Sequence, residues 1–365
     1  MLNLKQLIID EIEQKGPLSL ARFIELSLAH QSEGYYSLTK SIGKDSDFIT
    51  SPEISQLFGE IIGVWCVNLW QLIGSPADIA LVELGPGNGT LISDILRITK
   101  NVDGFHNAIS VHLIELNNNL RQKQRAALDQ FADIKKYWHN DASNLPQKPA
   151  IFIANEFFDA LPISQYIRRK DSWYAIHIDV TRPDLDLAFC EIPIDQKTHD
   201  IIENEYAHVP RNGIIEISDM SSYIIKQIAD HIVKYDGGGL FIDYGYEDSN
   251  NRLFISSLQA VKSHKYHSPF ADLGAVDLSS YVNFTALKDA AKLHGAKVLG
   301  QITQRQFLLN MHMKARLERL LATATKPQQD IIIKGYNRLV NPDQMGLLFK
   351  AMAITRPELN GYMGF

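Results

Sequence analysis

Between Asp78 and Asn155 the chain alternates short apolar runs with amphipathic helical stretches, and this alternation constrains the fold more than any other feature. The apolar runs are IALVEL, ISVHLIEL, the weaker IKKYW, and AIFIAN, and the helical stretches between the first three are TLISDILRI and NLRQKQRAALDQFA. Strands that alternate with helices form βαβ units, in which the strands are parallel and the crossovers right-handed. The sequence therefore predicts an α/β fold with a mostly parallel sheet.

The patterns on either side of this region predict four segments along the chain. Residues 1–75 carry helical patterns at 4–16, 18–30 and 51–74 and no strand pattern, so we expect an N-terminal helical cap without a sheet of its own. Residues 76–162 form the first half of the α/β core. Residues 163–235 contain strand-like runs and helices and predict an inserted α+β lobe. Residues 236–365 complete the core with a buried strand, a hairpin over 297–309 and C-terminal helices.

Charge and cysteine content exclude several classes of protein. Lys and Arg number 36 against 42 Asp and Glu, a net charge of −6, so no basic domain is available for nucleic acid. Two cysteines cannot build a disulfide framework or a cysteine zinc site, and His264 and His267 have no third ligand, so no metal is expected. The start lacks signal-peptide features and no apolar run reaches about 18 residues, which predicts a cytoplasmic protein without a membrane span.

A glycine-rich turn follows the first apolar run, in the sequence VELGPGNGT. Gly85, Gly87 and Gly89 have the spacing G-x-G-x-G, which differs from both the dinucleotide fingerprint and the phosphate-binding loop. With Glu83 before it, the turn resembles the first motif of class I methyltransferases, whose glycines admit the amino acid part of S-adenosylmethionine. An NAD-linked oxidoreductase is the less favoured alternative.

Two more acidic residues match this resemblance in order along the chain. Glu115 ends the second apolar run, where methyltransferases hold the ribose hydroxyls, and Asp141 follows the third, where the family meets the adenine. At the end of the fourth run, NEFFDALP replaces the Asn/Asp-Pro-Pro-aromatic signature of enzymes that methylate nucleobase amino groups. It places Glu156 and Asp159 three residues apart at the presumed cofactor cleft, where helix capping is their alternative role.

Motifs along nearly the whole chain are similar to those of the MidA family, which includes a mitochondrial complex I assembly factor that is a protein-arginine methyltransferase. They are Gly34–Tyr36, Asp47–Glu60, ELGPGNGTL, NEFFDALP, Ile242–Gly245, Leu258–Val261, His264, Asp277–Leu278, Val282–Phe284 and Met345–Lys350. The resemblance implies a Rossmann-like class I methyltransferase that uses S-adenosylmethionine. It also implies a protein substrate, the large hydrophilic subunit of respiratory NADH dehydrogenase, and an N-terminal segment that closes over the cofactor.

The expected site follows from these matches. The cofactor-binding residues expected are Thr50, Pro52, Glu83, Gly85, Gly87, Gly89, Glu115, Asp141 and Asn155. An arginine acceptor has a guanidinium pKa above about 12, so carboxylates are needed to orient it and to take a proton. Glu156 and Asp159 are the first candidates, and Asp243 either faces the same site or caps a loop. A non-catalytic assembly factor that retains the methyltransferase fold is the main alternative.

Overall fold

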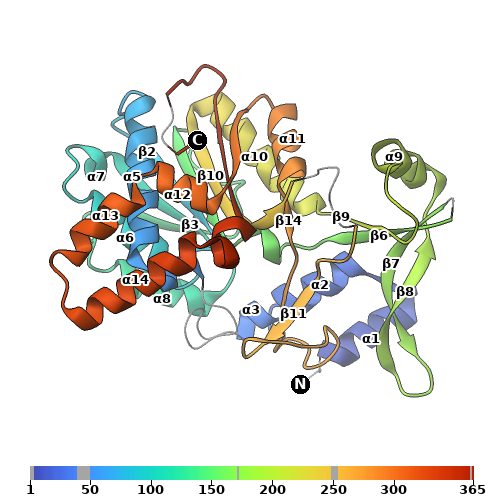
Figure 1. The fold of residues 1–365 in the computed structure, drawn as a ribbon. Helices are drawn as coiled ribbons and strands as arrows, with labels where there is room; N and C mark the ends of the chain where they lie inside the picture. Colours follow the sequence, from blue (N-terminus) through green and yellow to red (C-terminus); the bar gives the residue numbers. More distant parts are fainter. Residues whose placement is uncertain (1–3, 39–49, 171, 248–253, 362–363) are drawn as a thin grey trace. The chain divides into compact units, whose positions relative to one another are not determined.

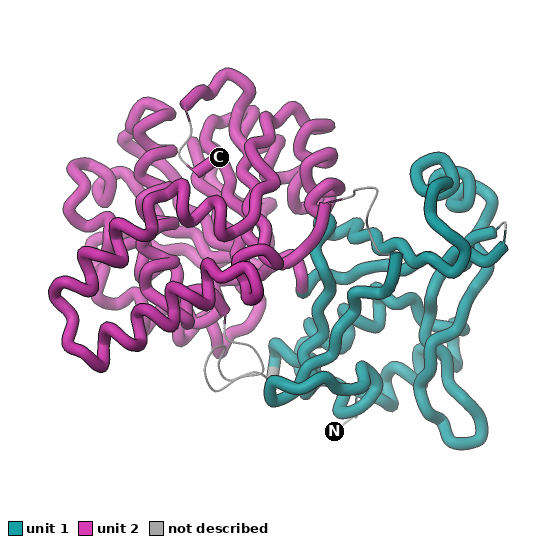
Figure 2. Tube along the Cα trace, viewed as in Figure 1, with its two compact units in different colours: residues 1–39, 160–221, 248–283 teal, residues 40–159, 222–247, 284–365 magenta. Residues whose placement is uncertain are grey.

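A computed structural model describes residues 4–38, 50–170, 172–247, 254–361 and 364–365. The motif residues Asp47, Phe48 and Ile49 lie outside the described residues. The chain forms two compact units (Figure 2). Unit 1 comprises Met1–Thr39, Ala160–Ser221 and Asp248–Asn283, and unit 2 comprises Lys40–Asp159, Ser222–Glu247 and Phe284–Phe365.

The alternating region forms the centre of the sheet in unit 2 (Figure 1). In spatial order its strands are β15 (Lys297–Thr303), β16 (Phe349–Thr355), β10 (Gly237–Tyr246), β5 (Ala150–Asn155), β2 (Ile79–Leu84), β3 (Ile109–Ile114) and β4 (Lys136–His139). The pairs from β10 to β4 are parallel, whereas β16 runs antiparallel to β10 and β15. This mostly parallel arrangement confirms the predicted α/β class.

Helices cover both faces of this sheet because its central strands are apolar on both sides. The helices of unit 2 are α4 (Ser51–Ile54), α5 (Gln56–Leu72), α6 (Thr90–Thr99), α7 (Phe105–Ala108), α8 (Asn118–Leu128), α10 (Asp219–Tyr235), α11 (Phe284–Leu293), α12 (Gln304–Asn310), α13 (Met313–Leu321) and α14 (Lys326–Val340), with a π turn at Pro342–Gly346. Ile151 and Ile153 share one core cluster with α5, α6 and α12–α14. Phe152, between them, points the other way and contacts His231 of α10 edge to face.

Unit 1 is built on antiparallel strands and has its own core, which contains Phe23 and Ile178. Its elements are α1 (Leu4–Lys15), β1 (Leu18–Ser19), α2 (Leu20–Ala29), α3 (Tyr35–Leu38), β6 (Ser164–Arg169), β7 (Ser172–Thr181), β8 (Asp186–Pro193), α9 (Gln196–Tyr206), β9 (Ile214–Ile217), β11 (Gln259–Lys262), β12 (Lys265–Tyr266), β13 (Asp277–Ser279) and β14 (Val282–Asn283). One sheet has the order β1-β7-β6-β9 with β8 on β7, and a second has the order β12-β11-β13.

The N-terminal region differs from the predicted helical cap. Leu18 and Ser19 pair with β7, so the second helix starts at Leu20, where the Ser19 hydroxyl accepts a hydrogen bond from the Arg22 N–H. The first 39 residues join unit 1 and the rest of the predicted cap joins unit 2. The division of the chain therefore follows packing against strands distant in sequence and not the helical pattern alone.

Two further predictions of local structure are wrong. The helix predicted over residues 51–74 is interrupted at Ser55, whose extended backbone (φ −160°) separates α4 from α5 and whose hydroxyl caps the Leu57 N–H. The hairpin predicted over residues 297–309 is instead β15 followed by α12, because Thr303 caps the N-terminus of α12. Among the described residues, no helix combines the length and the apolarity needed to cross a bilayer.

Candidate active site

The carboxyl ends of the parallel strands bring the predicted site residues to one edge of the sheet of unit 2. Leu84 of β2 is level with Ile114 of β3 and Ala154 of β5, and Ile242 of β10 is level with Asn155. The residues that follow these positions are therefore neighbours along that edge. In open α/β sheets, ligands bind outside the carboxyl ends of the strands.

The glycine turn joins β2 to α6 in a conformation that only glycine adopts readily. Gly85, Gly87 and Gly89 have φ of +63°, +52° and +82°, all in the left-handed region. A Cβ atom on Gly85 would lie 2.8 Å from Cδ2 of Phe157, so the turn packs directly on the loop that carries Glu156 and Asp159. The N-terminus of α6 begins at Thr90 and directs its backbone N–H groups toward this edge.

Glu83 lies under the glycine turn and is 3% exposed. Burial raises the pKa of Glu83 to about 8, with the Glu115 charge adding to the shift and a backbone hydrogen bond at Ile92 opposing it. Its Oε2 atom is buried and accepts no hydrogen bond within the part of the chain that the structure describes. A buried carboxylate oxygen without a donor is costly, and a ligand with an N–H or O–H group would satisfy it.

Glu115 follows β3 directly and is held in place from two sides. Its Oε1 accepts the Asn117 N–H at 2.8 Å, and its Oε2 accepts Nε2 of Gln124 at 3.1 Å. Burial raises the pKa of Glu115, and these hydrogen bonds oppose the rise. Asp141 lies on a neighbouring exposed turn, where its carboxylate accepts the Ser143 N–H at 2.8 Å. Hydrogen bonds from the Ser143 hydroxyl and from this N–H lower the pKa of Asp141.

The N-terminal segment brings Ser51 and Glu53 into hydrogen bonds with this edge of the sheet. Asn88 and Thr90 of the glycine turn donate to Oε1 of Glu53 at 3.2 and 2.5 Å. Thr50 occupies the N-cap position of α4 and Pro52 its first turn, so these residues shape the segment that places Ser51 and Glu53.

Glu156 combines an unusual backbone with a raised pKa. Its φ is +50°, a left-handed conformation that non-glycine residues seldom adopt. Its Oε1 accepts the Ser51 N–H at 2.7 Å, the Ser51 hydroxyl at 2.8 Å and Nδ2 of Asn155 at 3.1 Å. Burial raises the pKa of Glu156 to about 7, against these hydrogen bonds, and Asp159 raises it further. The carboxylate is thus held through one oxygen.

Asp243 is a buried support for the same loop. It is 1% exposed, and its Oδ2 accepts the N–H groups of Phe157, Phe158 and Asp159 at 3.1, 3.0 and 3.3 Å. Its Oδ1 accepts the Tyr244 N–H at 2.9 Å. Burial raises the pKa of Asp243 well above its ordinary value, and Asp159 and Glu156 add to the rise. This is the loop-capping geometry that the sequence leaves open for Asp243.

Comparison with known proteins shows the family. The model of the family Methyltransf_28, described as an S-adenosyl-L-methionine-dependent methyltransferase, matches residues 61–302. The chain belongs to this family.

Relatives and solved structures agree with this assignment. A Xenopus tropicalis protein named protein arginine methyltransferase NDUFAF7, mitochondrial, is 34% identical over 95% of this chain and 84% of its own length. The human protein of that name is 31% identical over 94% of this chain and 81% of its own length. The structure of a COG1565 superfamily member from Burkholderia thailandensis with bound S-adenosyl-homocysteine superposes with a TM-score of 0.85 at 22% identity, over 99% of this chain and 93% of that one. The MidA resemblance and the fold are confirmed.

The cofactor of this methyltransferase is S-adenosylmethionine, and the site fits it. The ammonium and ribose hydroxyl groups of this cofactor are hydrogen-bond donors. Buried acceptor oxygens stand at the glycine turn and at the neighbouring strand end: Oε2 of Glu83 and Oδ1 of Asn155 have no donor among the described residues. Within the same described residues, no group of three His, Cys, Asp or Glu side chains could hold a metal ion.

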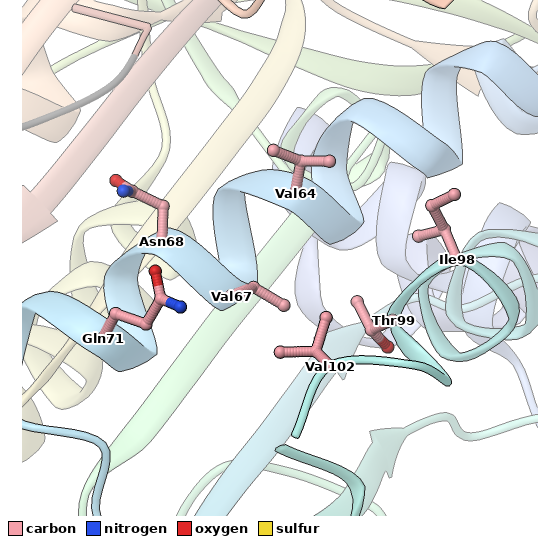
Figure 3. Close-up of a pocket in the computed structure, with 7 residues that line it drawn as sticks. All are labelled: Val64, Val67, Asn68, Gln71, Ile98, Thr99 and Val102. Atoms are coloured by element: carbon pink, nitrogen blue, oxygen red, sulfur yellow. The ribbon is translucent and has the colours of Figure 1, made fainter. Parts of the chain in front are cut away.

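A separate pocket of about 310 Å³ lies elsewhere in this methyltransferase. Figure 3 shows that it opens between α5 and the end of α6. Its lining residues are Val64, Val67, Asn68, Gln71, Ile98, Thr99 and Val102. None of the predicted site residues lines it, so this pocket and the sheet edge are different places on unit 2.

Sequence reasoning missed Gln124, which contacts both the glycine turn and Glu115. Its Nε2 donates to the Gly87 carbonyl at 2.8 Å as well as to Glu115. One signal was available in the sequence, because Gln124 stands midway between Leu120 and Leu128 at a spacing of four, in the buried stripe of α8. A polar residue in such a stripe calls for a hydrogen-bond partner.

Proposed function

We propose that this methyltransferase transfers a methyl group from S-adenosylmethionine to an arginine side chain of a protein. The observation that carries the proposal is the packing of the Glu156–Asp159 loop on the glycine turn, through Phe157 and Gly85. Acidic side chains are thereby placed beside the turn that we assign to the cofactor. The names of the relatives, which describe protein arginine methyltransferases, support the same acceptor.

The residues have distinct roles in this proposal. Glu83, Gly85, Gly87, Gly89, Glu115, Asp141 and Asn155 bind the cofactor, with Thr50 and Pro52 shaping the segment beside it. Glu156 and Asp159 hold the guanidinium of the acceptor, and Asp243 positions their loop through its backbone N–H groups. Asp243 is therefore a positioning residue, because its four hydrogen bonds leave it buried away from an acceptor.

In this proposal, the protein orients the acceptor and accepts a proton from it. When bound, S-adenosylmethionine supplies an electrophilic methyl group on a sulfonium. Glu156 and Asp159 orient one guanidinium nitrogen in line with that methyl group and balance the positive charge. The new N–C bond would form as the S–C bond of the sulfonium breaks and its electron pair passes to sulfur. The guanidinium nitrogen would lose a proton, and the Glu156 carboxylate would accept it, because its pKa of about 7 lies near neutral pH.

The proposal also covers the protein that is methylated and the cellular location of this methyltransferase. By family resemblance, we propose that the acceptor is the large hydrophilic subunit of respiratory NADH dehydrogenase. The names of the relatives contain the word mitochondrial, whereas the sequence of this chain predicts a cytoplasmic protein, and we propose the cytoplasm as its location. The alternative of an NAD-linked oxidoreductase is superseded by the family match.

The test uses isotopically labelled S-adenosylmethionine and cell extract as the source of acceptor. Glu156→Gln and Asp159→Asn should each lower methyl incorporation about a hundredfold, because each removes a charge aligned with the acceptor. Cofactor affinity measured by calorimetry should stay within a few-fold, whereas Glu115→Ala should weaken it directly. Glu205→Gln, on the exposed surface of α9, is the matched control and should leave both values unchanged.

Two results would contradict the proposal. Cofactor binding without any methyl incorporation in the unmodified protein would support the alternative of a non-catalytic assembly factor. Loss of cofactor affinity with normal turnover at saturation in Glu156→Gln would move Glu156 into the cofactor site.

A further inference from the structure

Gln124 is a completely buried polar side chain in α8, at 0% exposure. Leu120 and Leu128, one turn before and after it, are apolar and also buried. An amide placed in such a stripe costs free energy unless its donors and its acceptor are all satisfied. The partners of Gln124 therefore explain why a glutamine stands at this position.

Both ends of the Gln124 amide are used, and they reach three different elements. The Nε2 group donates to the carbonyl of Gly87 at 2.8 Å and to Oε2 of Glu115 at 3.1 Å. The Oε1 atom accepts Nε1–H of Trp138, in β4, at 2.9 Å. An amide has two N–H donors and an acceptor oxygen, so only glutamine supplies this set at this side-chain length.

The glycine turn also packs on the main chain of Gln124. A Cβ atom on Gly89 would lie 3.2 Å from Cα of Gln124, so α8 approaches the turn at a distance that leaves little room for a side chain. The turn and the carboxylate of Glu115 thus meet at one residue of α8. A single side chain fixes the distance between them.

We propose that Gln124 is a positioning residue for S-adenosylmethionine, acting through Gly87 and Glu115. The inference rests on the proposed function, because it takes from there the assignment of both groups to the cofactor. The amide orients the Gly87 carbonyl and thereby the peptide plane of the turn, and it holds Glu115 in one rotamer. Its hydrogen bond also favours the ionised form of Glu115 against the effect of burial.

The experiment measures the affinity for S-adenosylhomocysteine by calorimetry in two variants of the full chain. Gln124→Met keeps the length and removes all three hydrogen bonds, and we expect a dissociation constant about tenfold higher. Gln124→Glu keeps the acceptor for Trp138 but places a carboxylate against the Gly87 carbonyl and Glu115, so its loss should be larger. Gln122→Met and Gln122→Glu, exposed on the same helix, are matched controls and should leave affinity unchanged.

A double-mutant cycle with Glu115→Ala separates positioning from a general effect on folding. If Gln124 acts through Glu115, Gln124→Met should weaken binding less in the Glu115→Ala background than in the unmodified protein. An undiminished effect in that background, or unchanged affinity in both Gln124 variants, would overturn the role of Gln124. Unchanged affinity in both Glu115→Ala and Gly87→Val would instead overturn the proposed cofactor site itself. If Gln124→Met fails to fold, the effect of Gln124→Glu on affinity is measured in the same two backgrounds instead.

Discussion

Glu156 shows how one residue can be strained and still be well defined. A left-handed backbone at a non-glycine residue costs about 1–2 kcal/mol. The cost is offset by contacts that fix both the main chain and the side chain: the Glu156 N–H donates to the Ile242 carbonyl at 2.9 Å, and Ser51 holds the carboxylate. Outliers of this kind cluster at functional sites, where they aim a side chain.

The raised pKa of Glu156 predicts how methyl transfer depends on pH. Below the pKa of about 7 the carboxyl is protonated and can neither pair with a guanidinium nor accept its proton. We expect kcat/KM for the acceptor, which reports the pKa values of the free enzyme, to rise as the pH increases through this value, and Glu156→Gln to abolish that dependence. A steady-state pH profile of both proteins checks this. If the pH profile of Glu156→Gln rises in the same way, the pH dependence belongs to another titratable group.

The raised pKa of Glu156 also makes the stability of the fold depend on pH, and this dependence runs opposite to that of methyl transfer. Because the pKa of Glu156 is higher in the folded than in the unfolded chain, folding favours the protonated form. The contribution of this group to the free energy of unfolding is present at pH values below 4.5 and is lost as the pH rises to about 7. The pH that favours catalysis is thus the pH at which this residue stabilises the fold least.

The backbone conformation of Gly87 predicts how a substitution at this position affects ligand affinity. At a φ of +52°, a β-branched residue is strained, and its methyl groups would crowd the turn that we assign to the cofactor. We expect Gly87→Val to lower the affinity for S-adenosylhomocysteine more than about a hundredfold while the far-ultraviolet dichroism stays native. Gly16→Val is the control, because Gly16 has a φ of +85° and no atom within 4 Å of its Cβ position. Equal loss of affinity in both variants would contradict this prediction.

At the scale of elements, a buried carboxylate joins three helices of unit 2. Glu60 of α5 is 1% exposed, and its oxygens accept Nη1 of Arg97 from α6 at 2.9 Å and Nε of Arg316 from α13 at 2.6 Å. Both arginines are partly exposed, so their charges retain some hydration. The carboxylate is the buried member, and its two hydrogen bonds tie helices that lie far apart in the sequence.

This arrangement predicts a measurable loss of stability. Glu60→Gln leaves one charge-assisted hydrogen bond at most, and we expect the free energy of unfolding in urea to fall by about 1–3 kcal/mol. The exposed pair Arg169–Glu191 provides the control, since Glu191→Gln removes a surface ion pair and should leave the unfolding midpoint unchanged. Equal midpoints for the two variants would show that the three-helix contact adds no stability.

The elements that sequence patterns predict are those with continuous local signals. The strands β2, β3 and β5 are short, mainly apolar runs, and the glycine turn and Glu115 were predicted from their positions at the ends of these runs. The break at Ser55 and the N-cap at Thr303 were missed because the apolar spacing continues past both residues. The contacts of Ser51 with Glu156 and of Gln124 with Gly87 join segments 105 and 37 residues apart, which periodicity cannot report.

At the scale of the whole molecule, the predicted cofactor and acceptor residues all belong to unit 2, although that unit is assembled from three separate stretches of chain. Unit 1, with its antiparallel sheets and separate core, is formed by the stretch that precedes them and by the two stretches between them. The chain therefore passes back and forth between the two units, and each unit depends on segments distant in sequence.

This organisation predicts where ligand binding protects the backbone. Hydrogen exchange with and without S-adenosylhomocysteine should slow most in residues 79–90 and 109–124, which carry the glycine turn, Glu115 and Gln124. Binding stabilises the native state by mass action, by about 2.7 kcal/mol at a ligand concentration a hundred times the dissociation constant. Peptides from α9 serve as an internal reference and should be unaffected. Protection confined to unit 1 would contradict the placement of the cofactor.

The hydrogen bonds from the Glu156–Asp159 loop to Asp243 affect when this loop can fold during translation. Phe157, Phe158 and Asp159 leave the ribosome some 84 to 86 residues before the carboxylate that binds their N–H groups. Until β10 has emerged and paired with β5, the loop has no partner for these donors. The loop that carries Glu156 and Asp159 therefore gains this buried acceptor only after the residues of the glycine turn have long been synthesised.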